Sequence, residues 1–185
     1  MDTKSLLIEK AKKLFQKKGY KGVGLNEILK ACDITKGALY HHFPNGKEEL
    51  LISCLQSMQK EITTDINMVF QQHTSTLAAT KAIVDKLTAA HDARSKITGY
   101  TFSSIVSEMS ALSEPVRNAC AAFYEEIQEI NFKKLLADGY PEDEAASLSL
   151  FMTVSIEGAM TLCLAKDSTL PLSNINEILP KLLKD

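Results

Sequence analysis

The chain has 185 residues, which is the length of one ordinary domain or of a small domain joined to a larger one. Apolar residues make up 45% and charged residues 24%, with 8 Gly and 5 Pro, so the composition excludes a disordered chain, a collagen-like repeat and a low-complexity linker. The net charge of -2, taken whole, argues against a nucleic-acid-binding protein. However, residues 1–50 hold ten basic against six acidic residues, a charge of +4, whereas residues 51–185 hold 11 basic against 17 acidic residues, a charge of -6.

Neither the amino terminus nor the cysteines indicate export. Charged residues from Glu9 onwards interrupt the apolar run at residues 6–8, which is too short for a secretory signal. The four cysteines are scattered without a C-x-x-C spacing, so they indicate neither a disulfide framework nor a zinc site. They are typical of small buried side chains in a reducing compartment. The sequence therefore predicts a cytoplasmic protein.

Apolar residues recur at helical spacing along nearly the whole chain. No run of five or more residues alternates cleanly between apolar and polar, so we expect an all-α fold. The first helix should bury a face made of Leu7, Ala11, Leu14 and Phe15, and the third should begin after an N-cap at Thr35. The expected helices cover residues 4–18, 25–32, 36–40, 47–71, 76–93, 101–111, 114–137, 142–166 and 173–183.

The segment 145–165 is long enough to span a bilayer, and Glu157 is its only charged residue. A carboxylate near the middle of a span would cost about 2.5 to 3.5 kcal/mol on insertion, and five Ser or Thr residues dilute the hydrophobicity further. We therefore favour a helix buried at an interface between packed layers over a membrane span.

Residues 24–43, GLNEILKACDITKGALYHHF, have the pattern of a helix-turn-helix. In this motif two short helices are joined by three or four residues, and the second helix enters a major groove of DNA. Apolar residues are expected to pack the two helices together, with a small residue allowing a close crossing. These are Ile28, Ala31, Ile34 and Leu39.

The start of the second helix carries Thr35, Lys36, Gly37 and Ala38. Its amide groups and the positive end of its dipole favour a phosphate or a base edge. Gly37 costs about 1 kcal/mol relative to Ala inside a helix, which indicates that the backbone approaches another molecule closely. A surface helix that merely contains a glycine is the alternative.

Three elements of this region resemble the amino-terminal domain of TetR-family transcriptional repressors. They are Gly19-Tyr20 at the end of a helix, Gly37-Ala38-Leu39-Tyr40-His41-His42-Phe43, and Lys47-Glu48-Glu49-Leu50 after a turn. The resemblance covers roughly residues 5–55, and its fixed spacings are specific. Residues 24–28 and 43–50 most resemble the subgroup of lincomycin-resistance and flavonoid-responsive repressors, and residues 99–102 and 156–159 are similar, less specifically, to its carboxy-terminal domain.

The resemblance implies an architecture and partners. An amino-terminal three-helix helix-turn-helix domain, residues 1–48, would be joined by a long helix to a helical ligand-binding and dimerisation domain, residues 49–185. The partners would be double-stranded operator DNA, a small hydrophobic or aromatic inducer, and a second copy of the chain. The implied function is a ligand-responsive transcriptional repressor. The rival hypothesis is a helical small-molecule-binding or scaffold protein that has lost DNA binding.

The resemblance also assigns roles to individual positions. Four residues at the start of the second helix would face the groove, and Tyr40, His41 and Lys47 would bind phosphates, while Phe43 would belong to the core. Many relatives have Thr or Ser where this chain has Val23-Gly24, so a side-chain phosphate contact there must come from Asn26. No Arg precedes Arg94, which leaves base recognition to Lys36. The expected DNA-binding residues are Asn26, Thr35, Lys36, Gly37, Ala38, Tyr40, His41 and Lys47.

Flexible and aromatic side chains in the second part of the chain either fill a core or line a cavity for an apolar ligand. Glu157 is expected to be a buried carboxylate that needs a partner in the dimer interface or on a ligand. The expected ligand-binding residues are Phe102, Met109, Phe123, Met152, Glu157 and Met160.

The sequence offers little support for catalysis. His41 and His42 are adjacent, so their side chains diverge by about 100° on a helix and do not readily share a metal ion. No His has a Glu three residues before it, and the glycine-rich phosphate loop and the G-x-S-x-G elbow are missing. We therefore expect no enzyme activity, no metal and no cofactor; a helical-bundle oxidoreductase is the enzyme alternative.

Overall fold

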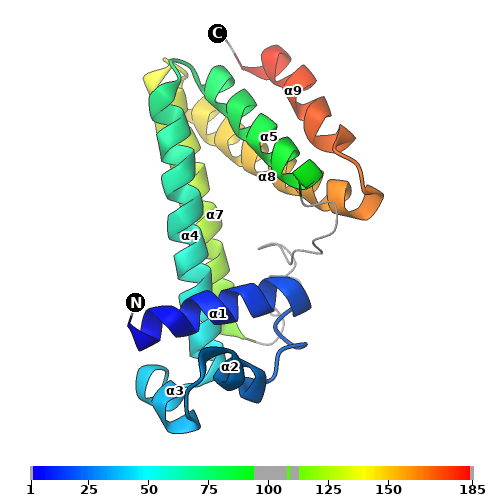
Figure 1. The fold of residues 1–185 in the computed structure, drawn as a ribbon. Coiled ribbons are helices and arrows are strands. Elements are labelled where there is room, and N and C mark those ends of the chain that lie inside the picture. Colours follow the sequence, from blue (N-terminus) through cyan, green and yellow to red (C-terminus); the bar gives the residue numbers. More distant parts are fainter. Residues whose placement is uncertain (1, 94–107, 109–112, 184–185) are drawn as a thin grey trace. The chain divides into compact units, whose positions relative to one another are not determined.

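The computed structural model describes residues 2–93, 108 and 113–183 (Figure 1). Within these residues the regular structure is helical throughout and contains no strand, which confirms the all-α prediction. The helices are α1 (Thr3–Lys18), α2 (Leu25–Cys32), α3 (Lys36–His42), α4 (Lys47–Gln72), α5 (Thr76–Ala93), α7 (Glu114–Ala137), α8 (Glu142–Lys166) and α9 (Leu170–Leu182).

Most helices begin and end within two residues of the predicted positions, and the predicted helix at 101–111 lies outside the described residues apart from Glu108. α9 is the exception, because it begins at Leu170 and not at residue 173. Pro171 lies in its first turn, where a missing N–H breaks no helical hydrogen bond, so this proline is part of the helix and does not precede it.

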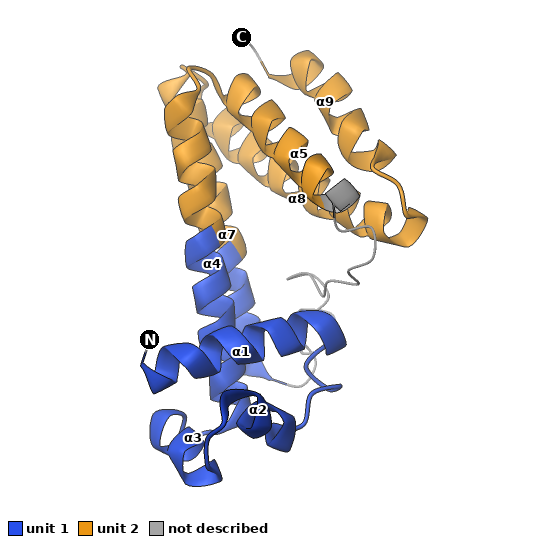
Figure 2. Cartoon of the chain, in the orientation of Figure 1, with its two compact units in different colours: residues 1–61, 97–123 blue, residues 62–96, 124–185 orange. Residues whose placement is uncertain are grey.

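The chain divides into two compact units (Figure 2). Unit 1 comprises residues 1–61 and 97–123, and unit 2 comprises residues 62–96 and 124–185. α4 and α7 each contribute residues to both units. The domain boundary expected after residue 48 falls inside α4 and stays a prediction.

Unit 1 is built around fully buried apolar side chains from its helices. Leu7 and Ala11 on α1, Ile28 on α2 and Leu39 on α3 are all 0% exposed. The prediction was wrong for Ala31, which is exposed and therefore does not set the spacing of the two helices. Five more buried apolar side chains complete the core of unit 1. They are Phe15, Val23, Phe43, Leu50 and Leu51.

Unit 2 packs α9 against α5 and α8. One apolar cluster contains Leu135, Met152 and Leu179, and a second contains Val84 and Cys163. A polar contact joins α7 to α5 at one end, since the Asp138 carboxylate accepts a hydrogen bond from the Thr76 N–H and pairs with Lys134 at 3.2 Å. This carboxylate thereby satisfies an N-terminal amide of α5.

The four cysteines are buried and carry free thiols, as the sequence predicts. Burial raises the pKa of Cys54 to about 12 and the pKa of Cys120 to about 11. Since the thiolate is the reactive form, these two side chains act as apolar core residues at neutral pH.

Candidate nucleic-acid interface

The turn between α2 and α3 is set by local backbone geometry. Asp33 ends α2 with a φ of 53°, in the left-handed region that Asp tolerates better than most residues. The Thr35 hydroxyl then accepts a hydrogen bond from the Ala38 N–H at 3.2 Å, which confirms the predicted N-cap of α3. The three residues between the helices give the short connection of a helix-turn-helix.

α3 separates residues that fold the chain from residues that face solvent. Leu39 and the following Phe43 are both 0% exposed, which confirms the core role expected of Phe43. Ala38 is half-buried. The expected DNA-binding residues that are exposed here are Thr35, Lys36, Gly37, Tyr40 and His41.

The exposed face of α3 is open at Gly37 and supported at Tyr40. A Cβ added to Gly37 would meet only the Thr35 hydroxyl, at 3.9 Å, so the space in front of this residue is free. The Tyr40 ring lies beside Gly46, where a Cβ would come within 3.3 Å of it. The Lys36 ammonium lies 5.8 Å from the centroid of the Tyr40 ring. Lys36 and Tyr40 therefore lie together on the exposed face.

Asn26 occupies the first turn of α2 and is exposed. The N-cap of α2 is Gly24, which has no side chain to accept a hydrogen bond from the first amides of the helix. An anion at this end would therefore meet backbone amides together with the Asn26 side chain.

Lys47 is less available than the sequence predicts. Its ammonium donates a hydrogen bond to the Tyr20 carbonyl at 2.6 Å and lies 3.9 Å from the centroid of the Tyr20 ring. Burial lowers the pKa of Lys47, and the negative charge of Glu108 opposes that shift. Lys47 is half-buried, so part of its hydrogen-bonding capacity is used within the chain.

The six expected ligand-binding residues fall into three groups. Phe102 and Met109 lie outside the described residues. Phe123 and Met152 are each 2% exposed and belong to the core. Met160 and Glu157 are half-buried, and the Tyr124 hydroxyl donates a hydrogen bond to Glu157 at 3.4 Å. Within the single chain Glu157 is therefore only half-buried, and the chain itself provides a partner for its carboxylate.

An apolar groove with a volume of about 410 Å³ lies on unit 2 between α8 and α9. Of the four expected ligand-binding residues that the structure describes, Met152 alone lines it. Eight of the eleven exposed large apolar side chains among the described residues belong to these two helices. Those that line the groove are Phe151, Val154, Leu162, Ile178 and Leu182.

α8 also has the length and apolarity of a membrane span. The mean hydropathy of its most apolar 18-residue window is 1.6, and 28% of that window is buried. Core and interface helices of proteins that do not enter membranes share these properties. Length and composition alone therefore do not assign α8 to a membrane.

Comparison with known proteins assigns both halves of the chain. The family described as bacterial regulatory proteins, tetR family, matches residues 7–54, and the family described as LmrA/YxaF-like transcriptional regulators, C-terminal domain, matches residues 76–178. The HTH-type transcriptional regulator LmrA of Bacillus subtilis (strain 168) is 33% identical over 183 residues, which are 99% of this chain and 97% of LmrA. The chain belongs to the TetR family. It is a DNA-binding transcriptional regulator.

Other TetR-family proteins agree with this assignment. The uncharacterized regulator YxaF of B. subtilis (strain 168) is 32% identical over 99% of this chain and 96% of its own length. The solved structure of reduced E. coli NemR has a TM-score of 0.84 at 21% identity, over 98% of this chain and 96% of that one. A TetR regulator from Legionella pneumophila also gives 0.84, at 20% identity, over 100% and 98% of the two chains. These two structures show that the fold is shared.

One residue of this TetR-family chain, Glu108, and the contacts of a second, Tyr20, were not predicted from the sequence. Glu108 accepts hydrogen bonds from the Tyr20 N–H at 3.1 Å and from the Lys21 N–H at 2.7 Å. Tyr20 was noted as part of a motif, but its contacts with Lys47 and Glu108 were not expected. Because 27 and 88 residues separate Tyr20 from these partners, no local spacing could indicate the contacts.

Proposed function

We propose that the chain is a homodimeric, ligand-responsive repressor whose two α3 helices enter successive major grooves of a palindromic operator. The observation that carries this proposal is the exposed face of α3, where Lys36 and Tyr40 lie beside the open backbone at Gly37. Helix entry into a groove needs such a face, because side chains and amides must reach base edges and phosphates.

Within that interface the residues have different tasks. Thr35, Lys36, Gly37 and Ala38 form the start of α3, where Lys36 is the base-reading side chain. Tyr40, His41 and Asn26 bind phosphates and fix the register without reading sequence. Lys47 adds a phosphate contact through the donors that its bond to the Tyr20 carbonyl leaves.

The second copy of the chain covers the groove between α8 and α9. Exposed apolar side chains such as Val154, at 61% exposure, and Leu162, at 48%, leave this surface unsuited to water. A symmetric partner would bring the same helices against it and bury both grooves together. A repressor that binds two DNA half-sites needs a second copy of the chain. This need favours a partner subunit over a lipid bilayer as the occupant of the groove.

A small hydrophobic or aromatic inducer would bind in the carboxy-terminal domain. Met160 and the hydrogen-bonded pair of Tyr124 and Glu157 supply an adaptable apolar wall with a polar group in it. An inducer that binds better to a dimer whose α3 spacing does not match the operator would release the DNA by that difference in affinity. We propose that the protein does this in the cytoplasm, without a cofactor and without catalysis.

A gel-shift titration with matched lysine variants tests the DNA-binding residues. The probe is a site selected from random DNA by the wild-type protein, titrated at several salt concentrations. Lys36→Ala should weaken binding and reduce the preference for the selected site, whereas Lys47→Ala should weaken binding to all DNA and reduce the salt slope by about one unit. Lys30→Ala is the control, because it removes the same charge from an exposed residue at the end of α2.

Two results would overturn the assignment. Binding that neither Lys36→Ala nor Lys47→Ala changes would place the interface elsewhere. A wild-type protein that selects no DNA at physiological salt would favour the rival function, a helical ligand-binding or scaffold protein.

A further inference from the structure

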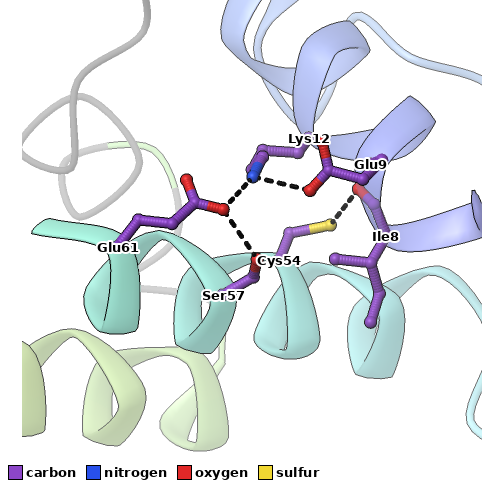
Figure 3. A network of polar contacts seen from close by, with 6 residues as sticks. All are labelled: Ile8, Glu9, Lys12, Cys54, Ser57 and Glu61. Atoms are coloured by element: carbon purple, nitrogen blue, oxygen red, sulfur yellow. Dashed lines mark hydrogen bonds and ion pairs between the residues drawn. The ribbon is translucent and has the colours of Figure 1, made fainter. Parts of the chain in front are cut away.

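A buried lysine connects α1 to α4 within unit 1 (Figure 3). Lys12 is 7% exposed, and its ammonium lies 2.8 Å from Oε1 of Glu9 and 2.6 Å from Oε1 of Glu61. The Ser57 hydroxyl donates a hydrogen bond at 3.3 Å to the same Glu61 oxygen. The Cys54 thiol donates to the Ile8 carbonyl at 3.5 Å.

These contacts follow one face of each helix. Ile8 and Lys12 are four residues apart on α1, and Cys54, Ser57 and Glu61 recur every three or four residues on α4. Residues at these spacings lie on the same side of a helix. The contacts therefore fix the position of α1 along α4, and not only its distance from it.

A lysine is an unusual choice for such a position. Burial alone lowers its pKa, but the hydrogen bonds to Glu61 and Glu9 outweigh this, so the pKa of Lys12 is raised and the charge is kept. An apolar residue of similar volume would often stabilise a buried contact as well or better. An ion pair between two helices resists sliding, because its favourable energy is lost when one helix shifts along the other.

The pair also occupies a particular place in the chain. Glu61 is the last α4 residue of unit 1, so α4 continues from it into unit 2. Lys12 lies on α1, which packs against α2 and is joined to it by the ion pair of Lys18 with Glu27. α1 in turn connects to the helix-turn-helix that carries α3. The position of α3 on α4 therefore depends on where α1 is held.

We propose that Lys12 and Glu61 are positioning residues for operator recognition: the pair holds the helix-turn-helix at one register on α4 without touching DNA. The proposal rests on the proposed function, in which a dimer must present two α3 helices at the spacing of successive grooves. A shift of α1 along α4 moves α3 relative to α4. Specific binding then falls, while binding to phosphates in general remains.

Glu9 and Glu61 provide a matched comparison. Both carboxylates contact the same ammonium, but Glu9 is on α1 itself and only Glu61 crosses to α4. Removal of either one makes the net-positive unit 1 more positive, which by charge alone would strengthen binding to DNA. The proposal predicts instead that removal of Glu61 weakens binding to the selected site, whereas removal of Glu9 does not weaken it.

The experiment measures binding of Glu61→Ala, Glu9→Ala and Lys12→Met to the selected site and to a scrambled duplex. We expect Glu61→Ala and Lys12→Met to reduce the preference for the selected site over the scrambled duplex about two- to thirtyfold, because a change of net charge acts on both duplexes alike and cancels in this ratio. The double variant should lose no more than either single one, because the two groups act as a unit. Thermal unfolding of each variant checks that the chain is folded, which is expected because the apolar core of unit 1 does not include Glu61, whose side chain is 60% exposed.

The outcomes separate this inference from the proposed function. Glu61→Ala that binds the selected site as well as Glu9→Ala would overturn the positioning role while leaving the repressor intact. Equal losses on both duplexes would also overturn it, since they indicate a general effect on folding or charge. A wild-type protein that does not prefer the selected site would overturn the proposed function itself.

Discussion

The proposed dimer makes a sharp prediction for Val154 on α8. In the single chain this side chain lines the apolar groove and is 61% exposed, so a charged residue there has access to water. In a symmetric dimer the same position would be covered by the partner. We therefore expect Val154→Glu to leave the folded chain intact and to dissociate the dimer.

The size of the effect follows from burial of two charges. An uncompensated buried charge costs about 3 to 5 kcal/mol, and a two-fold interface contains the substitution twice, so the penalty is about 6 to 10 kcal/mol per dimer. A dimer with a nanomolar dissociation constant is held by about 12 kcal/mol. The remaining 2 to 6 kcal/mol, roughly, corresponds to a dissociation constant weaker than about 10 µM.

Sedimentation velocity at about 1 µM protein would then show a monomer for Val154→Glu and a dimer for the wild type. Leu136→Glu is the control, because Leu136 is also exposed, at 39%, but lies on α7 outside the groove. Operator binding should weaken when the dimer dissociates, because a monomer binds only one half-site. A Val154→Glu protein that sediments as the wild type does would refute the proposed interface, and so would a monomeric wild type.

Two further predictions concern stability. Gly22→Ala should destabilise the chain by about 1 to 3 kcal/mol in urea unfolding, because the new Cβ would clash with the Lys18 carbonyl oxygen; Gly37→Ala, with open space around it, should show no such loss, and equal effects would contradict the steric argument. Burial raises the pKa of Asp138, but its hydrogen bonds with Thr76 outweigh this and hold that pKa below its ordinary value of about 3.9. Its stabilising contribution is therefore present above that value and is lost as pH falls through the lower folded pKa. The difference in urea midpoint between wild type and Asp138→Asn should shrink below about pH 4; a constant difference would contradict it.

Local signals predicted the fold well. Helix starts and ends depend on caps and turn residues that act over three or four positions, as the Thr35 hydroxyl does on the Ala38 N–H. The core face of α1 was also largely predicted, with Leu7, Ala11 and Phe15 buried and Leu14 only half-buried. Periodicity works here because burial repeats with the helical turn.

The polar contacts of the candidate site could not be predicted in the same way. Lys12 lies on α1 beside the apolar face, about 60° from Phe15 on a helical wheel, but its burial depends on Glu61, which is 49 residues away. Lys47 was predicted to bind a DNA phosphate. In the structure it donates a hydrogen bond to the carbonyl of Tyr20, which lies in the α1–α2 connection. Such contacts depend on tertiary structure, which spacing along one helix does not encode.

The division of labour within α3 has a consequence for how new specificities arise. Leu39 and Phe43 anchor the segment in the core, whereas Lys36, Gly37 and Tyr40 point to solvent. Substitutions at the second set remove no side chain from the apolar core, so we expect the fold to tolerate most of them, with Tyr40 the most restricted because its ring lies beside Gly46. Under the proposed function, a small library at these three exposed positions should therefore yield folded variants that bind other operators.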